Sequence, residues 1–346
     1  MTANHKLSSL CFISLSKAIF FQEQKRLSFG GDGREVPPGF PKEFEEDVDG
    51  GLRNKLSWKM EYKNQHTVPE SYLRAWCDPS TPNGAFVWTV SKKDRKISRK
   101  SPKSLFSEDD FYTYYDSRNN RFLELEHKLK EIEDKFIQLR DIKIKKRIQL
   151  SEDDRLTIAL FASSTFARTK RWKEDGQKIW QEYIEMVKNF PSHIANEIKA
   201  SQAYKDVINV HKDQPMIFHL FLFINSTTRY LYEMNCAIYE TESEPGFITS
   251  DNPCFWFDPA IYDPNKPLTY FGIGSPTLNI LLPISPRHLV SLEMKGADGY
   301  IDLHFRSDDE VDFIDSLNYL IASSCDKYIV VNRKTFKDRW FDDSSK

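Results

Sequence analysis

The chain has 346 residues and a mass of 40.6 kDa, long enough for one large domain or two ordinary ones whose core needs no disulfide or metal. Its 49 Lys and Arg against 51 Asp and Glu give a net charge of -2, so any nucleic-acid surface must be a local patch. Only 13 glycines and an aromatic share of 14% argue against a disordered chain and against a glycine-rich cofactor fold.

Residues 1–59 differ from the rest of the chain. They contain glycine and proline breakers, an acidic run at 43–49, and no sustained helical or strand period. We therefore expect residues 1–59 to form a disordered leader. Met60 stands immediately before the first ordered-looking segment, so we expect it to be the natural start, with the leader outside the native protein. Residues 60–346 are expected to form a single domain.

The first ordered segment predicts a short helix and then strands. Pro69 suits the first turn of a helix, and Tyr72 and Trp76 share its apolar face. Apolar residues alternate at 86–90, and an aromatic, β-branched run follows at 111–115. These two runs together predict a small antiparallel sheet.

The middle of the chain predicts helices. Apolar residues follow a 3-4-3-4-3 spacing over 122–139, which is the clearest helical period in the sequence. Ser151 and Asp154 form a variant capping box that begins a second helix, apolar on most sides, which runs to Trp172. Two further helices are expected at about 174–200 and 214–235.

The last third returns to strands. Pro-rich turns separate the strands expected at 237–239, 246–249, 278–284 and 288–292, and a final strand is expected at 328–331. A full capping box at Ser307–Glu310 predicts a helix before that last strand. The element order predicts an α+β fold, with a central α-helical bundle flanked by small antiparallel β-sheet elements from the N- and C-terminal parts.

The sequence lacks the strong local motifs. It has no dinucleotide-binding glycine pattern, P-loop, His-Glu-x-x-His, Gly-x-Ser-x-Gly or EF-hand pattern, and no Cys-x-x-Cys pair among its five cysteines. Its apolar runs are shorter than the roughly 20 residues that span a bilayer. We therefore expect no membrane partner, and assign no cofactor or metal. The candidate site residues are polar side chains set in apolar segments, where burial costs free energy unless they are paired.

Two candidates flank the first predicted helix. His66 lies just before its N-terminus, where an imidazole can transfer protons or contact an anion, and Arg74 lies further along the same helix. The alternative is a histidine that hydrogen-bonds to the backbone and an arginine on a solvated face.

Arg168 is the third candidate. It lies at i+4 from Ser164 and i+7 from Phe161 on the apolar helix. A partly buried guanidinium requires a carboxylate or a phosphate. The alternative to a phosphate site is a structural pair with Glu126 or another acid.

Asp251 and Asn252 follow a predicted strand and precede a proline. An Asx turn explains this pattern structurally, whereas a functional site would use Asp251 as a base or metal ligand and Asn252 as an orienting donor. Asn318 lies beside the apolar stripe of the last helix, as either a buried cap or a site contact.

Several motifs occur in order along the chain: Gln65-His66-x-Val68-Pro69-x-x-Tyr72-Leu73-Arg74-x-Trp76, Asp110-Phe111-Tyr112, Leu125-Glu126, Arg168-Thr169, Phe247-Ile248-Thr249-Ser250-Asp251-Asn252-Pro253 and Leu282-Pro283-Ile284-Ser285-Pro286. Together they resemble the bacterial domain-of-unknown-function 4238 family over about residues 62–331. Trp76 stands where that family usually has Phe, which preserves an aromatic anchor. The resemblance implies a cytoplasmic prokaryotic protein, and it supplies no activity.

Three functions follow as hypotheses. The first is a hydrolase or nuclease-type effector acting on phosphodiesters, with His66 as general acid or base, Arg74 and Arg168 binding phosphate, and Asp251 and Asn252 activating water or holding a metal. Nucleic acid would then bind through a local patch. The second is a non-catalytic binding or regulatory module in which the same residues form a structural polar network. The third is a toxin-like protein that acts on another protein.

Overall fold

The structure is a computed structural model that describes residues 63–81, 84, 86–115, 121–200, 215–260, 275–303 and 307–341. Contacts divide the chain into two units, Met1–Lys63 and Asn64–Lys346, and the elements below belong to the second. The expected leader at 1–59 and the expected start at Met60 lie outside the described residues. None of the described helices is both long and apolar enough to cross a membrane.

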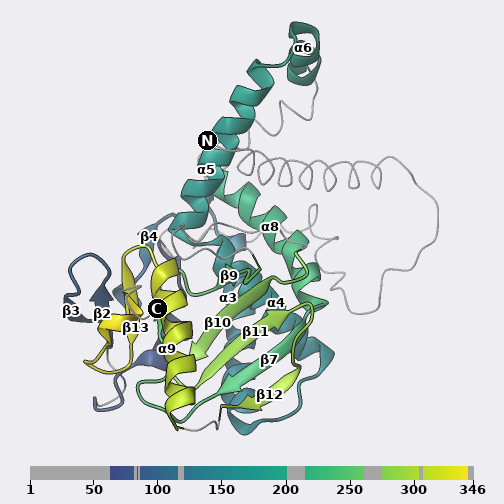
Figure 1. Cartoon of the computed structure of the whole chain (residues 1–346). Coiled ribbons are helices and arrows are strands. Elements are labelled where there is room, and N and C mark those ends of the chain that lie inside the picture. The colour runs from purple at the N-terminus through teal and green to yellow at the C-terminus, as the bar shows by residue number, and fades with distance from the viewer. Residues whose placement is uncertain are drawn as a thin grey trace, which may run out of the picture. The chain divides into compact units, whose positions relative to one another are not determined.

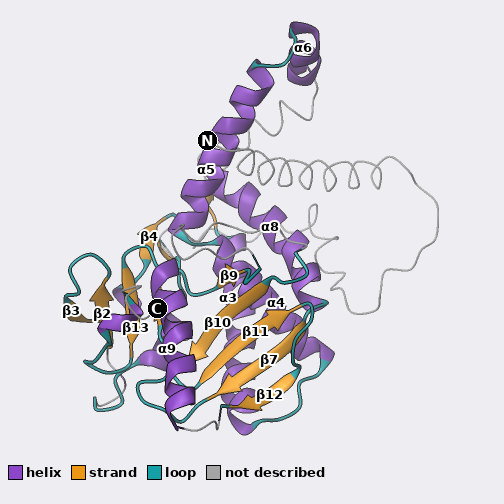
Figure 2. Cartoon of the chain, viewed as in Figure 1, coloured by secondary structure: helices purple, strands orange, loops and turns teal. Residues whose placement is uncertain are grey.

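The mixture of helices and sheets expected from the sequence is confirmed (Figures 1 and 2). The described α-helices are α2 (Glu70–Leu73), α3 (Glu124–Gln138), α4 (Glu152–Ala167), α5 (Lys170–Lys188), α6 (Ser192–Ala200), α8 (Pro215–Tyr232) and α9 (Ser307–Ser324). The Ser151 capping box forms as expected, because the Ser151 hydroxyl accepts from the Asp154 N–H while the Asp154 carboxylate accepts from the Ser151 N–H.

Two expected helices differ from the structure. The helix expected at about 174–200 is divided into α5 and α6. The second helix was expected to run to Trp172, but α4 ends at Ala167 and a new helix begins after Thr169. The Thr169 hydroxyl accepts a hydrogen bond from the Trp172 N–H and caps α5, so the chain turns at Arg168.

The largest sheet has the order β12-β7-β11-β10-β9. Its strands are β7 (Asn235–Glu240), β9 (Phe255–Phe257), β10 (Asn279–Ser285), β11 (His288–Glu293) and β12 (Gly299–Asp302). This sheet is larger than the small antiparallel elements expected, and β12 pairs with β7 in parallel. After β11 the chain crosses past β7 and adds β12 on the opposite side of β7, which makes β12 parallel to β7. The local sequence pattern of a strand does not reveal such a crossing.

A second sheet joins distant parts of the chain in the order β3-β2-β13-β8. Its strands are β2 (Val87–Ser91), β3 (Ile97–Lys100), β8 (Thr249–Ser250) and β13 (Tyr328–Val331). The expected pairing of 86–90 with 111–115 is wrong. Strand β5 (Tyr114–Tyr115) pairs with β6 (Arg121–Phe122) instead, and β2 pairs with β3 and β13.

Helices cover both faces of the five-stranded sheet. Helix α9 lies in front of it in Figure 1, and α3 and α4 lie behind it. Ile314 and Leu317 of α9 share one core with Leu281 and Leu289 of the sheet. On the other face Phe166 of α4 stacks on Trp256 of β9 and on Phe223 of α8, with ring centroids 4.8 Å and 5.3 Å apart. Phe136 of α3 stacks on Phe161 of α4, with centroids 3.8 Å apart. Helices α3, α4 and α8 therefore pack as a group behind the sheet.

The segment that carries His66 is fixed from both ends. Strand β1 (Asn64–His66) pairs antiparallel with β4 (Ser107–Asp109), so His66 lies opposite Ser107. The Thr67 N–H and hydroxyl both bond to the Phe106 carbonyl. Helix α2 follows directly after Pro69. This arrangement holds His66 at the end of a small sheet, just before helix α2.

Candidate functional site

Five polar side chains from four separate segments converge behind β1. We call them the Arg168 cluster: His66 from β1, Tyr112 from the loop after β4, Glu126 and Glu133 from α3, and Arg168 from the turn between α4 and α5. Electrostatic interactions join Glu126 to His66, Tyr112, Glu133 and Arg168. Sequence reasoning singled out His66 and Arg168 separately, and the fold gives them Glu126 as a shared neighbour.

Arg168 is fully buried. Its Nη1 donates to Glu133 Oε1 at 2.5 Å, so its acid partner is Glu133 rather than Glu126. Burial alone would lower the pKa of Arg168, but Glu133, Tyr112 and Glu126 raise it, and the guanidinium stays charged.

The other edge of the Arg168 guanidinium is unpaired. Nε and Nη2 are buried and have no hydrogen-bond partner among the described residues. These two atoms form one side of the planar fork, the geometry that matches two oxygens of a carboxylate or a phosphate. An unpaired, desolvated donor costs about 1–3 kcal/mol, so this donor edge requires an acceptor from outside the described side chains, either a water or a ligand oxygen.

Glu126 is the matching unpaired acceptor. Its Oε2 is buried and likewise has no hydrogen-bond partner within the described part of the chain. Burial raises the pKa of Glu126, while the hydrogen bond from Tyr112 and the charge of Arg168 oppose the rise. A carboxyl held near an arginine, with a raised pKa, is typical of a proton-transfer group.

Tyr112 connects this carboxyl to the strand that carries His66. Burial raises the pKa of Tyr112 well above its ordinary value, so its hydroxyl remains a donor. The hydroxyl also lies 3.3 Å from the His66 carbonyl. Gln65 fixes the same loop, because its Oε1 accepts from the Tyr112 N–H at 2.8 Å and its Nε2 donates to Thr113 Oγ1 at 2.7 Å.

The contacts of His66 define its tautomer. Nε2 lies 3.0 Å from the Lys103 carbonyl oxygen. A carbonyl only accepts, so Nε2 carries the ring proton in the neutral imidazole and Nδ1 keeps its lone pair. His66 is partly exposed, so this lone pair can act as a base toward a ligand or water. No described group of three or more His, Cys, Asp or Glu side chains is arranged to hold a metal ion.

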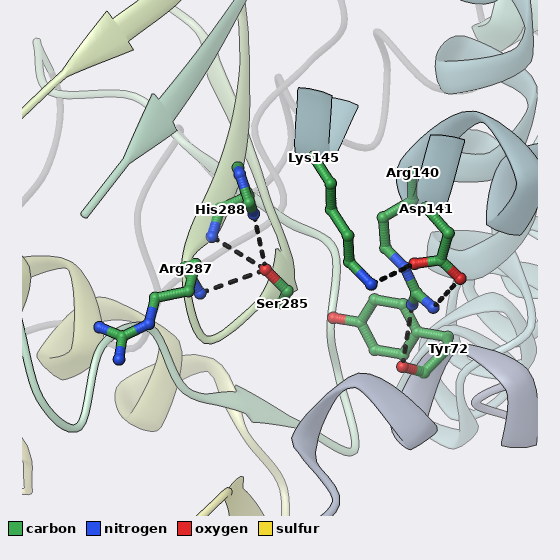
Figure 3. A network of polar contacts seen from close by, with 7 residues as sticks. All are labelled: Tyr72, Arg140, Asp141, Lys145, Ser285, Arg287 and His288. Atoms are coloured by element: carbon green, nitrogen blue, oxygen red, sulfur yellow. Dashed lines mark hydrogen bonds and ion pairs between the residues drawn. The ribbon is translucent and has the colours of Figure 1, made fainter. Parts of the chain in front are cut away.

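A second polar network lies between α2, the helical turns that follow α3 (Leu139–Lys143 and Ile144–Lys146) and the β10–β11 hairpin (Figure 3). The Tyr72 hydroxyl donates to the Pro283 carbonyl at 2.5 Å and shares a 2.7 Å hydrogen bond with Thr249. Arg140 binds both carboxylate oxygens of Asp141 and contacts the Tyr72 carbonyl. Each of these polar groups has a partner within the protein, so this half of the network serves as scaffold.

The other half of the network closes the hairpin. Ser285 Oγ accepts from the Arg287 and His288 N–H groups, so its own proton points to His288 Nδ1 at 2.9 Å (Figure 3). His288 Nε2 then faces Glu240 Oε1 at 3.5 Å. Burial lowers the pKa of His288, and Glu240 opposes that change. The backbone occupies the Ser285 oxygen as a turn acceptor, so the hydroxyl is not placed as a nucleophile.

The remaining sequence candidates have contacts of their own. Arg74 is exposed and pairs with Glu70 one turn earlier at 2.5 Å. Asp251 accepts hydrogen bonds from three successive N–H groups, those of residues 326–328, at 2.7–3.1 Å. Burial raises the pKa of Asp251 to about 6 despite these donors. Asn252 donates to the Ser324 carbonyl, which Arg171 also contacts. Among the described residues, no contact of these three leads to His66.

Asn318 is a buried cap. Its Nδ2 donates to the Gly246 carbonyl at 2.9 Å and its Oδ1 accepts from the Ile248 N–H at 3.0 Å. Of its two sequence interpretations, the structure favours the cap over a site contact.

Sequence reasoning gave Glu133 no role and named Glu126 only as a partner. Both lie one position after a residue of the apolar stripe, Leu125 and Ile132, and they are seven positions apart. Two acids at this spacing occupy one side of a helix beside its buried face. That pattern was the available signal for a paired role.

The comparisons with known proteins agree with this arrangement of motifs. The family model described as a protein of unknown function (DUF4238) matches residues 64–335. No curated protein and no solved structure matches the chain. The match spans most of the chain and includes every residue of the Arg168 cluster, so the protein belongs to the DUF4238 family.

Proposed function

We propose that this protein hydrolyses phosphodiesters at the Arg168 cluster. The observation that carries the proposal is the pairing of a buried, unpartnered guanidinium edge on Arg168 with a buried, unpartnered carboxyl oxygen on Glu126. A phosphodiester offers the first group two non-bridging oxygens that share one negative charge, and offers the second a leaving ester oxygen that needs a proton. His66 supplies the complementary lone pair.

Each residue of the cluster then has its own role in the reaction. Nε and Nη2 of Arg168 bind the two non-bridging oxygens and stabilise the charge that develops on them. A water molecule attacks phosphorus while its proton passes to Nδ1 of His66. The bond from phosphorus to the leaving oxygen breaks, and that oxygen takes the proton of Glu126. Glu133 holds Arg168 by its other edge and acts as a positioning residue.

Arg74, Asp251 and Asn252 have scaffold roles in this proposal, instead of the phosphate-binding and water-activating roles that their sequence context suggested. The salt bridge of Arg74 is exposed, and the Asp251 carboxylate is saturated by backbone donors. For these three residues, the contacts support the second hypothesis, in which polar residues form a structural network. The Arg168 cluster differs because its unpaired atoms make it an incomplete network.

The test is hydrolysis of bis(4-nitrophenyl) phosphate by the full chain and by Glu126→Gln, which keeps the shape of the side chain and removes its proton. We expect a rate loss of about 100-fold or more while the variant melts no lower than the parent does. Arg74→Ala is the matched control and should keep the parent rate. If Glu126→Gln is as active as the parent, or if the parent shows no hydrolysis while each cluster variant melts far lower, the cluster is structural and the proposal fails.

A further inference from the structure

The β2–β3 hairpin and the segment after it carry an unusual local charge. Residues 91–104 contain seven Lys or Arg and a single acid, Asp94, in a chain whose net charge is -2. Two of these cations have internal roles. Lys92 donates to the Ser323 and Cys325 carbonyls at the end of α9, and Arg95 lies over the Phe341 ring at 3.7 Å.

The other five cations form what we call the basic strip: Lys93, Lys96, Arg99, Lys100 and Lys103. All five are exposed, and within the part of the chain that the structure describes none of them forms an ion pair. Exposed lysines elsewhere do pair, as Lys130 does with Asp134 at 3.0 Å. A row of unpaired cations attracts a polyanion, because binding releases the counterions of both surfaces.

Aromatic rings border the strip. Arg99 lies 4.9 Å from the Phe86 ring and 5.7 Å from the Trp88 ring, and Lys334 approaches Trp88 at 5.8 Å. The indole N–H of Trp88 is fixed on Asp78 at 2.6 Å, and both rings are partly exposed. Fixed aromatic rings and guanidinium planes are surfaces on which unpaired bases stack.

The strip leads to the Arg168 cluster. Strand β3 is extended, at about 3.3 Å per residue, and a single turn at Pro102–Ser104 follows it. Lys103 belongs to that turn, and its carbonyl lies 3.0 Å from His66 Nε2. Lys103, the last residue of the strip, therefore also contacts the proposed base through its backbone carbonyl.

We propose that the basic strip binds the sugar–phosphate backbone of single-stranded nucleic acid and directs it toward His66. The stacking surfaces favour a single strand, whose bases are free, over a duplex, whose bases are already stacked. The strip presents charge without large exposed apolar side chains, which disfavours insertion into a lipid surface. The delivery of the strand to a reaction rests on the proposed function, whereas its binding does not.

The experiment measures binding of a fluorescein-labelled 20-nucleotide single strand by anisotropy over a range of salt concentrations. The protein carries Glu126→Gln throughout, so binding is read without turnover and a failure of binding is distinct from a failure of hydrolysis. The test variant adds Lys96→Gln, Arg99→Gln and Lys100→Gln. The control variant adds Lys128→Gln and Lys130→Gln, which remove cations of α3 that already pair with acids.

We expect the test variant to bind at least tenfold more weakly and the slope of log affinity against log salt to fall by about two, whereas the control binds as the parent does. Equal binding by the test variant and the parent overturns the proposal. So does equal affinity for a duplex of the same length. Binding to phosphatidylserine vesicles without binding to the strand overturns it in favour of a membrane surface.

Discussion

The hydroxyl groups of Tyr72 and Thr249 share a 2.7 Å hydrogen bond although 177 positions separate them in the chain. A few residues away the Trp76 indole N–H donates to the Phe247 carbonyl at 2.9 Å. Both contacts join the motif that runs from Gln65 to Trp76 to the motif that runs from Phe247 to Pro253, two of the motifs of the family resemblance. The two blocks thus form one structural unit, and packing accounts for these motif residues without any catalytic role.

Replacing Tyr72 with Phe tests this unit. The substitution leaves the Pro283 carbonyl and the Thr249 hydroxyl without their buried partner. We expect the free energy of unfolding to fall by about 1–3 kcal/mol, measured by urea denaturation. Tyr300→Phe is the control, since Tyr300 donates to the Ile148 carbonyl at an exposed position and should cost less than about 1 kcal/mol. Equal effects of the two variants would argue against a structural role for the Tyr72 hydroxyl.

Replacing Asp251 with Ala tests the structural role of the motif that runs from Phe247 to Pro253. It leaves three backbone N–H groups at the start of β13 without their acceptor. We expect a loss of about 1–2 kcal/mol, because the three hydrogen bonds lie at exposed positions where water can replace part of what is lost. The matched control is Asp94→Ala in an exposed turn, where the carboxylate accepts from the Lys96 N–H at 3.4 Å. A variant that melts as the parent does would restore Asp251 as a candidate for chemistry.

Local sequence signals predicted the elements that local interactions determine. The apolar spacing at 122–139 corresponds to α3, and the capping box at Ser151 forms as expected. The break at Thr169 was missed because its cap lies inside a run that continues the helical period on both sides. A Thr three positions before Trp172, followed by basic residues, was the signal available.

The candidate site was harder to predict, because its contacts are long-range. His66 and Arg168 were found from their chemistry in an apolar context. Glu133 pairs with Arg168 across 35 positions, and no local pattern reports such a distance. Asp251 shows the opposite case. Its sequence context, a strand end before a proline, is shared by catalytic loops and by turns, and only the three backbone donors distinguish the two.

Inorganic phosphate should stabilise the parent through Arg168. A ligand that binds only the folded state raises the melting temperature, by an amount that grows with the logarithm of its concentration. We expect a rise with phosphate and none with chloride at the same ionic strength, measured by calorimetry. Arg168→Met keeps much of the buried volume and removes the donor edge, so the rise should disappear. Arg74→Ala should retain it. A rise that survives in Arg168→Met would place the anion elsewhere.

The pH dependence of stability reports the state of Glu126. Burial raises its pKa above the ordinary value of 4.5, so the folded chain holds this proton more tightly than the unfolded chain does. The stability gained from protonation is therefore fully present below the ordinary pKa and is lost as the pH rises through the raised one. Glu126→Gln cannot ionise and escapes this loss. The melting temperature of the variant minus that of the parent should thus increase as the pH rises above 4.5. Glu131→Gln, at an exposed position beside Lys128, should show no such trend. A difference that stays constant or falls with pH would mean that the Glu126 carboxylate is stabilised in the fold, and that it does not hold the proton that the proposed acid must donate.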